Sequence, residues 1–182
     1  MLLNLILWTM SFLPFLAAMP TTPGPLQKRC TNVLQNPSFE SGIDPWLAMA
    51  FGSWAQRGVY TSASGGHDGR NFYFGQSNAT VASSSLNLSQ SGLQIPAGTT
   101  VDCSTWVATD RPGNVGNTHV ELFVDEQSCG SVYLGTTGWT KVGGKVKVSG
   151  DSHTFSIIAV SSETGPEGGA IWVDDAVLGT GC

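Results

Sequence analysis

Short apolar runs separated by turn-forming residues occupy the chain from about residue 30 to its end. Gly, Pro, Asn or Ser interrupts each run, which is the pattern of β-strands joined by turns. No apolar stripe with a 3.6-residue period is visible, so helices are not expected. We expect strands near residues 31–35, 47–56, 71–75, 80–90, 100–109, 118–125, 130–134, 140–148, 153–161 and 170–178. This pattern predicts a single all-β domain, either a sandwich or a barrel.

The strand expected at 100–109 has two different faces, because successive side chains of a strand point in opposite directions. One set is expected to point into the core: Val101, Cys103, Thr105 and Val107. The opposite face then presents Asp102, Ser104 and Trp106 to the outside.

Residues 170–179, AIWVDDAVLG, form an apolar run that two adjacent acids interrupt, Asp174 and Asp175. Carboxylates in a buried row need partners, so we expect a final strand with a charged kink. The best candidate partner is Glu40, which follows a short apolar run within residues 33–42, VLQNPSFESG. The first and last strands are therefore expected to meet.

Several of these segments resemble the motifs of carbohydrate-binding modules of the CenC type. The matching segments, in order, are NPSFESG at 36–42, the loop at 62–71, LQIPAGTT at 93–100, CSTWV at 103–107, Trp139 and VDDAVL at 173–178. Two positions depart from the family pattern: Ala176 replaces the usual Val, and Val101 stands in the position of a Tyr. The resemblance covers residues 34–178 and implies a jelly roll, a two-sheet antiparallel β-sandwich.

The first 29 residues predict a leader. Residues 2–18 are apolar but shorter than the roughly 20 residues that span a bilayer, so residues 1–18 predict a signal peptide. Residues 19–29 are rich in Pro and Thr and end in Lys28-Arg29, which resembles a propeptide cut by a kexin-type protease. A membrane anchor and an uncleaved linker are the respective alternatives. Residues 30–182 would then form the mature, secreted domain.

The chain is acidic, with a formal net charge of −5. Removing the leader takes away two basic residues, so 6 remain against 13 acidic ones and the net charge becomes −7. Such a surface does not attract phosphate backbones. We therefore expect no nucleic-acid partner. We also expect no membrane partner and a monomeric protein.

Secretion makes the four cysteines a question of disulfides. Three connectivities are possible. If the first and last strands are neighbours, Cys30 and Cys182 meet, and Cys103 then pairs with Cys129. Zinc is disfavoured because no metal-binding Cys or His spacing is present. Asn78 and Asn87 lie in glycosylation sequons and should be on the surface.

The resemblance implies polysaccharide binding by aromatic side chains on a concave sheet face, with a cell-wall polymer of the glucan or xylan class as the expected partner. Sugar rings have an apolar face that lies flat on an aromatic ring, while their hydroxyls take hydrogen bonds. The best candidates are Trp106 as the platform, Tyr73 and Trp54 as helpers, and Ser104 as a polar contact. Packing is the alternative role for each aromatic residue. Trp46 is a candidate for the rim of the cleft, whereas Trp139 and Trp172 are assigned to structure.

Related modules carry a structural calcium ion where the first and last strands meet. By resemblance we assign Glu40 and Asp174 as carboxylate ligands, with backbone carbonyls of the turn at residues 67–69 completing an oxygen cage. The alternative is a set of hydrogen bonds from backbone N–H groups to these carboxylates, with no ion.

No catalytic arrangement is visible. Glu121, an acid within an expected strand, has no obvious partner carboxylate, and no G-x-S-x-G motif is present. The sequence thus predicts a secreted, non-catalytic carbohydrate-binding module. A secreted structural or interaction protein with the same fold and no sugar binding is the alternative.

Overall fold

The computed structural model describes residues 30–77, 83–109, 118–135, 138–162 and 169–182, so the leader and Asn78 lie outside the described residues. Within these ranges the regular structure is entirely β, and no helix is long and apolar enough to cross a membrane. The strands are β1 (Thr31–Asn32), β2 (Leu47–Phe51), β3 (Trp54–Thr61), β4 (Asn71–Ser77), β5 (Ser84–Gln94), β6 (Thr100–Ala108), β7 (Thr118–Val124), β8 (Gln127–Tyr133), β9 (Thr140–Lys147), β10 (Ser152–Ser161) and β11 (Ala170–Thr180).

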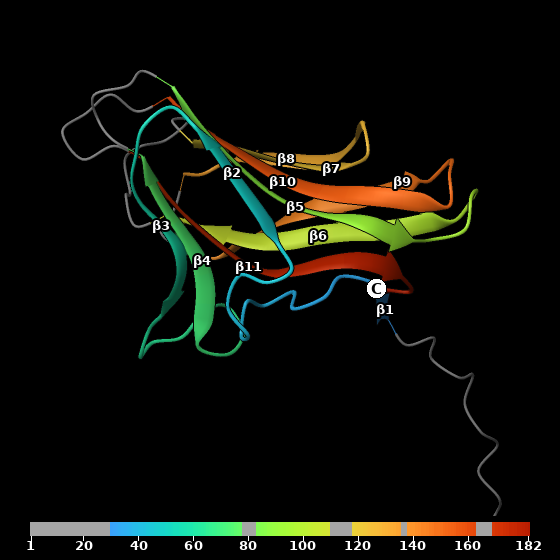
Figure 1. Cartoon of the computed structure of the whole chain (residues 1–182), viewed down its shortest axis with the longest axis horizontal. Coiled ribbons are helices and arrows are strands. Elements are labelled where there is room, and N and C mark those ends of the chain that lie inside the picture. Colours follow the sequence, from blue (N-terminus) through green and yellow to red (C-terminus); the bar gives the residue numbers. More distant parts are fainter. Residues whose placement is uncertain (1–29, 78–82, 110–117, 136–137, 163–168) are drawn as a thin grey trace, which may run out of the picture.

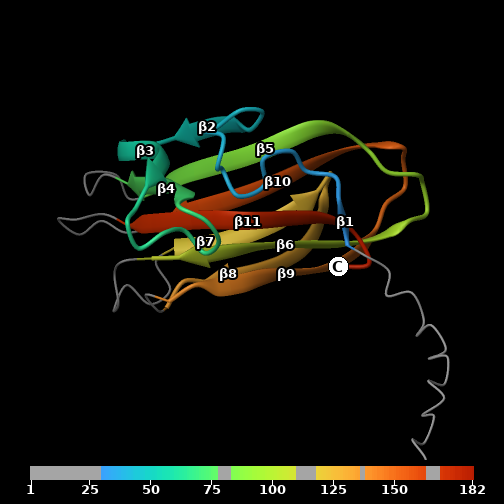
Figure 2. The same cartoon turned by 90° about the horizontal axis from the view of Figure 1, so that it is seen from below.

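Two antiparallel sheets form a jelly-roll β-sandwich. The six-stranded sheet has the order β3-β4-β11-β6-β9, with β1 added beside β11, and the five-stranded sheet has the order β2-β5-β10-β7-β8. Figure 1 shows β5 and β10 of one sheet above β6 and β11 of the other. In the view of Figure 2, β11 runs between β4 and β6. The expected fold class is confirmed.

The core lies between the two sheets, where the alternating apolar side chains of both meet. On β6, the inward residues are the predicted ones, Val101, Cys103, Thr105 and Val107, and all four are buried. Leu86 and Leu88 of β5 and Phe155 of β10 face them from the other sheet. Each fully buried side chain of this size contributes roughly 1.5–3 kcal/mol, so the alternation of the strands is the main source of stability.

The prediction of a single strand at 47–56 is wrong, because the chain passes from one sheet to the other within this segment. β2 belongs to the five-stranded sheet and β3 to the six-stranded sheet. The break falls at Gly52, whose φ of +80° favours glycine. An added Cβ there would lie 2.8 Å from the Ser83 carbonyl oxygen. The close backbone approach therefore permits only a glycine at this crossing.

The two ends of the described chain lie side by side, as expected. Thr31 and Asn32 pair with Thr180 and Gly179, and the C-terminus lies next to β1 in Figure 1. A disulfide joins Cys30 to Cys182, with Cα atoms 4.4 Å apart.

The second disulfide joins Cys103 of β6 to Cys129 of β8. It therefore links the two sheets. Both predicted pairings are confirmed.

Candidate functional site

The final strand is kinked where the two acids were expected to interrupt it. The register between β11 and β6 shifts between Asp174 and Val177, and Asp175 has a φ of +46° in the left-handed region. This bulge leaves Asp174 fully buried, at 0% exposure. Bulges of this kind re-aim side chains that would otherwise follow the alternation of the strand.

Asp174 is surrounded by backbone donors. Its Oδ2 accepts hydrogen bonds from the N–H groups of His67 (2.7 Å) and Asp68 (3.3 Å), and its Oδ1 accepts one from the Asp175 N–H (2.8 Å). Thr105 Oγ1 donates to the Asp174 carbonyl oxygen at 2.8 Å. Burial raises the pKa of Asp174 to about 6, against the lowering effect of the hydrogen bonds from these N–H groups.

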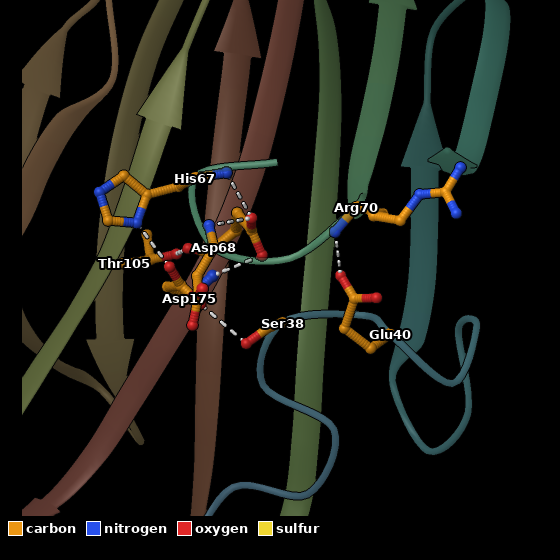
Figure 3. A network of polar contacts seen from close by, with 8 residues as sticks. Ser38, Glu40, His67, Asp68, Arg70, Thr105 and Asp175 are labelled. Carbon is orange, nitrogen blue, oxygen red and sulfur yellow. Dashed lines mark hydrogen bonds and ion pairs between the residues drawn. The ribbon is translucent and has the colours of Figure 1, made fainter. Parts of the chain in front are cut away.

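Glu40 holds the other end of the same loop, residues 62–70. Its Oε1 accepts hydrogen bonds from the N–H groups of Arg70 (2.7 Å) and Asn71 (2.8 Å). Figure 3 shows Glu40 beneath the Arg70 end of the loop and His67 and Asp68 at the opposite end. The carboxylates from the two ends of the domain are therefore brought to one loop, though to different parts of it.

Two glycines allow this close approach of the loop. An added Cβ at Gly66 would collide with Asp174 Oδ2, and one at Gly69 would collide with the Glu40 carboxylate. Gly69 also has a φ of +78°, which L side chains rarely adopt. The Gly-rich composition of the loop thus serves the two carboxylates.

The contacts of Glu40 and Asp174 fit the ion-free alternative better than a calcium cage. It is N–H groups of the loop that point at both carboxylates, and an N–H cannot ligate a cation. Among the residues that the structure describes, no group of three or more His, Cys, Asp or Glu side chains could hold a metal ion. Calcium at Glu40 and Asp174 stays a prediction, with a melting experiment as its test.

Trp106 projects from the outer face of the six-stranded sheet, as the alternation of β6 predicts. Its indole is half-buried because the loop at 62–70 lies over it. The imidazole of His67 stacks on the indole with ring centroids 3.9 Å apart and an interplanar angle of 14°. His67 Nδ1 lies 2.5 Å from Asp175 Oδ2, and Ser38 Oγ donates to Asp175 Oδ1 at 2.7 Å. One face of the expected platform is therefore covered by His67.

More aromatic rings continue from His67 across the same outer face. Trp139 lies 5.9 Å from His67 and 6.2 Å from Trp172, and Phe72 lies 5.5 Å from Trp172, all between ring centroids. We call these five residues the outer aromatic group: His67, Phe72, Trp106, Trp139 and Trp172. They come from β4, β6, β11 and the segments before β4 and β9.

Trp139 and Trp172 pack against each other, but they do so outside the sandwich. The alternation of β11 was the signal that places Trp172 there, because its neighbours Ile171 and Val173 point into the core. The alternation that places Trp106 on the outer face of β6 therefore also places Trp172 on the outer face of β11.

Tyr73 was assigned to the ligand site, and that prediction is wrong. It is 1% exposed and packs in the core against Phe39, with ring centroids 5.9 Å apart. Trp46, expected at the rim of a cleft, is also buried in the core, against Phe39 and Phe155. Both side chains are buried in the core, so neither is accessible to a ligand.

Trp54 and Ser104, the other two predicted ligand contacts, lie in different parts of the domain. Trp54 is half-buried against the core, and its Nε1 donates to the carbonyl oxygens of Phe51 (3.1 Å) and Ser85 (3.2 Å). These contacts hold it between the sheets rather than beside Trp106. Ser104 lies on the same side of β6 as Trp106 but is buried, at 7% exposure.

A pocket of about 340 Å³ lies on this outer face beside Ser104, between β6, β9 and the C-terminus. Its lining includes Asp102, Ser104, Lys141, Gly143, Lys145 and Val177. Lys141 is the register partner of Trp106, so the pocket adjoins the outer aromatic group. Polar and charged side chains therefore lie next to the aromatic rings on the outer face of the six-stranded sheet.

The outer face of the five-stranded sheet carries a separate set of exposed residues. Leu47, Met49 and Phe51 of β2 are exposed. Tyr133 of β8 is 62% exposed, and its ring lies 4.5 Å from that of His119. Asn87 of β5 is half-buried, and its Oδ1 has no hydrogen-bond partner in the described part of the chain. Glycosylation of Asn87 stays a prediction.

No family model matches the sequence, and no curated protein matches it. Solved structures do resemble it. TmCBM61, in complex with β-1,4-galactotriose, matches with a TM-score of 0.58 at 24% identity, over 81% of this chain and 97% of that chain. A family 16 carbohydrate-binding module matches with a TM-score of 0.53 at 14% identity, over 81% of this chain and 99% of that chain.

A third similar structure contains an enzyme. The CBM22-1 and GH10 modules of Clostridium thermocellum xylanase 10B, complexed with xylohexaose, match with a TM-score of 0.56 at 16% identity. The match covers 81% of this chain and 28% of that chain, so this chain spans only about a quarter of the xylanase structure. The chain has the fold of carbohydrate-binding modules. At these identities, the likeness establishes the fold.

Proposed function

We propose that this protein is a secreted, non-catalytic module that binds polysaccharide outside the cell. The observation that carries the proposal is the outer aromatic group, five rings in contact on one outer sheet face next to a polar pocket. Aromatic rings beside hydrogen-bonding groups are the combination that sugar rings require.

The expected affinity is low. Covering about 100 Å² of an apolar sugar face contributes roughly 2.5 kcal/mol. Two or three such contacts, less the cost of association, correspond to micromolar to millimolar dissociation constants.

The likeness to known modules supports the same proposal. Two of the similar structures contain the sugars β-1,4-galactotriose and xylohexaose. The sequence motifs resemble those of the CenC type, and the two disulfides suit an oxidising compartment outside the cell. We propose no catalytic step, since the buried carboxylate of Asp174 and that of Glu40 serve to hold the loop.

The covering of Trp106 by His67 favours a second candidate function. A ring whose face is already stacked offers less surface to a sugar. A secreted structural or interaction protein that keeps the fold without binding sugar would tolerate such a contact. The two candidates differ in one measurable property, retention on polysaccharide.

The test is a pull-down against insoluble cellulose, xylan, β-glucan, galactan and chitin. We expect the wild type to be retained on at least one polymer and the Trp106→Ala variant to lose most of that retention. Tyr133→Ala, an exposed aromatic residue on the opposite sheet, is the matched control and should bind like the wild type. Thermal melts of all three proteins check that the variants are folded.

Two outcomes contradict the proposal. If the wild type binds none of these polymers, the second candidate, a structural or interaction protein, is the better account of the function. Loss of binding in Tyr133→Ala, with Trp106→Ala unaffected, moves the site to the five-stranded sheet.

A further inference from the structure

The lysines of the domain are not spread over its surface. Residues 30–182 contain three lysines, Lys141, Lys145 and Lys147, and all three lie on β9. The intervening residues Val142 and Val146 point into the core, so the three lysines share the outer face. A domain with 13 acidic residues thus places all of its lysines on one strand.

Two of these lysines line the pocket of about 340 Å³ on the outer face. Lys145 pairs with Asp102, which lies opposite it on β6. Lys141 pairs with no acid among the residues that the structure describes. It lies opposite Trp106, at the junction of the pocket and the outer aromatic group.

Gly143 separates the two lysines and is paired with Ser104. It has a φ of +147°, and an added Cβ would collide with the backbone of Cys103 and Ser104. The pocket wall between Lys141 and Lys145 therefore has no side chain. This leaves Ser104 of β6 in the lining, at the register position between those that face Lys141 and Lys145.

We propose that this pocket binds an acidic polysaccharide, one whose sugar rings carry carboxylates, with Lys141 as the main cationic contact and Lys145, which is shared with Asp102, beside it. The inference rests on the proposed function and names the class of polymer. A carboxylate would pair with Lys141, a hydroxyl would bond with Ser104, and a neighbouring ring would lie against the outer aromatic group. At physiological salt, charges more than about 8 Å away are largely screened. Asp102 lines the pocket and is paired with Lys145, so the charge left for a ligand is that of Lys141, and acidic residues beyond the screening distance do not cancel it.

Protection of a sheet edge is the simpler explanation for lysines on β9, which is an edge strand. It does not account for their distribution. The edge strands β2 and β8 carry no lysine, although both present exposed residues. Nor does it account for the pocket between Lys141 and Lys145.

The test compares one polymer in two charge states. Polygalacturonate and the same polymer with its carboxyl groups reduced to alcohols are titrated into the protein at 50 and 300 mM NaCl. We expect at least tenfold tighter binding of the acidic form at low salt, and most of that preference should disappear at high salt. A sulfated galactan and single-stranded DNA serve as anions of other classes.

The variants separate the pocket from general charge. Lys141→Gln should lower the affinity for polygalacturonate about tenfold and leave the affinity for the reduced polymer unchanged, whereas Lys141→Arg should retain most binding. Lys147→Gln is the matched control, because Lys147 is on the same strand and face but does not line the pocket. It should bind like the wild type. Melting temperatures confirm that all three variants are folded.

Each other result overturns a defined statement. Equal binding of both polymers overturns the acidic ligand and leaves the proposed function intact. Binding of neither polymer also overturns the acidic ligand, and the pull-down on neutral polysaccharides then decides separately whether the proposed function stands. Equal losses in Lys141→Gln and Lys147→Gln overturn the pocket as the site. Stronger binding of the sulfated galactan or of DNA than of polygalacturonate overturns the carboxylated sugar as the ligand.

Discussion

The imidazole of His67 lies flat on the indole of Trp106, 3.9 Å from it between ring centroids and tilted by 14°. His67 is held there by the loop, whose N–H groups bond to Asp174, and by its own contact with Asp175. The best candidate platform for a sugar is therefore covered by a residue whose position depends on the final strand.

Removing the His67 ring should expose Trp106. In His67→Ala we expect stronger quenching of tryptophan fluorescence by acrylamide. We also expect polysaccharide affinity to rise about 2- to 10-fold, since a stacked ring pair contributes about 0.5–1.5 kcal/mol beyond its buried area. His67→Phe keeps the cover and is the control. Unchanged quenching in His67→Ala, or an affinity that falls as far as in Trp106→Ala, would show that His67 is part of the platform.

The two carboxylates that hold the loop should differ in their effect on stability. Asp174→Ala leaves three backbone N–H groups without their acceptor in a buried site, which costs about 1–3 kcal/mol for each group that water cannot reach. Glu40→Ala should cost less, because its two N–H partners are exposed. Urea unfolding measures both free energies. Equal losses for the two variants would contradict the burial of the Asp174 contacts.

Calcium binding at Glu40 and Asp174 is tested by thermal melts. If an ion binds, added Ca²⁺ should raise the melting temperature and EDTA should lower it, because a ligand of the native state stabilises by RT ln(1 + [L]/Kd). Asp174→Ala should abolish the difference. Identical melts in Ca²⁺ and EDTA, with no metal found by elemental analysis, would show that hydrogen bonds from backbone N–H groups hold the two carboxylates without an ion.

The buried histidine His153 should make the stability of the domain depend on pH. His153 is 2% exposed, and its Nδ1 lies 2.7 Å from Asp125 Oδ2. Its Nε2 faces the carbonyl oxygens of Ile95 (3.1 Å) and Gly150 (2.8 Å). The hydrogen bond with Asp125 raises the pKa of His153 above its ordinary 6.5, although burial opposes it. Burial raises the pKa of Asp125. The hydrogen bonds with His153 and the Thr154 N–H lower this pKa by more than burial raises it, so that it lies below its ordinary 3.8.

The stabilisation from this pair should therefore be confined to a window of pH. The contribution of His153 is complete below pH 6.5 and is lost as pH rises through its raised pKa. The contribution of Asp125 is complete above pH 3.8 and is lost as pH falls through its lowered pKa. The difference in unfolding free energy between wild type and Asp125→Asn should be greatest near pH 5 and smaller at pH 8.5. A difference that does not change between pH 5 and pH 8.5 would mean that His153 does not change its charge over this range.

The sequence by itself determined most of the strands, the outward direction of Trp106, the kink at Asp174 and the meeting of the chain ends. These follow from local rules. Side chains alternate along a strand, an acid pair interrupts an apolar row, and cysteines at the two ends of a sandwich meet when its first and last strands pair.

Only the tertiary structure decided which face of β4 became the interior. The alternation of Phe72, Tyr73 and Phe74 places Tyr73 opposite its neighbours, but the second sheet determines that this side is the core. The stacking of His67 on Trp106 and the pocket between Lys141 and Lys145 likewise join segments far apart in the chain. Such contacts depend on the packing of one element against another, and periodicity along a single strand does not contain that information.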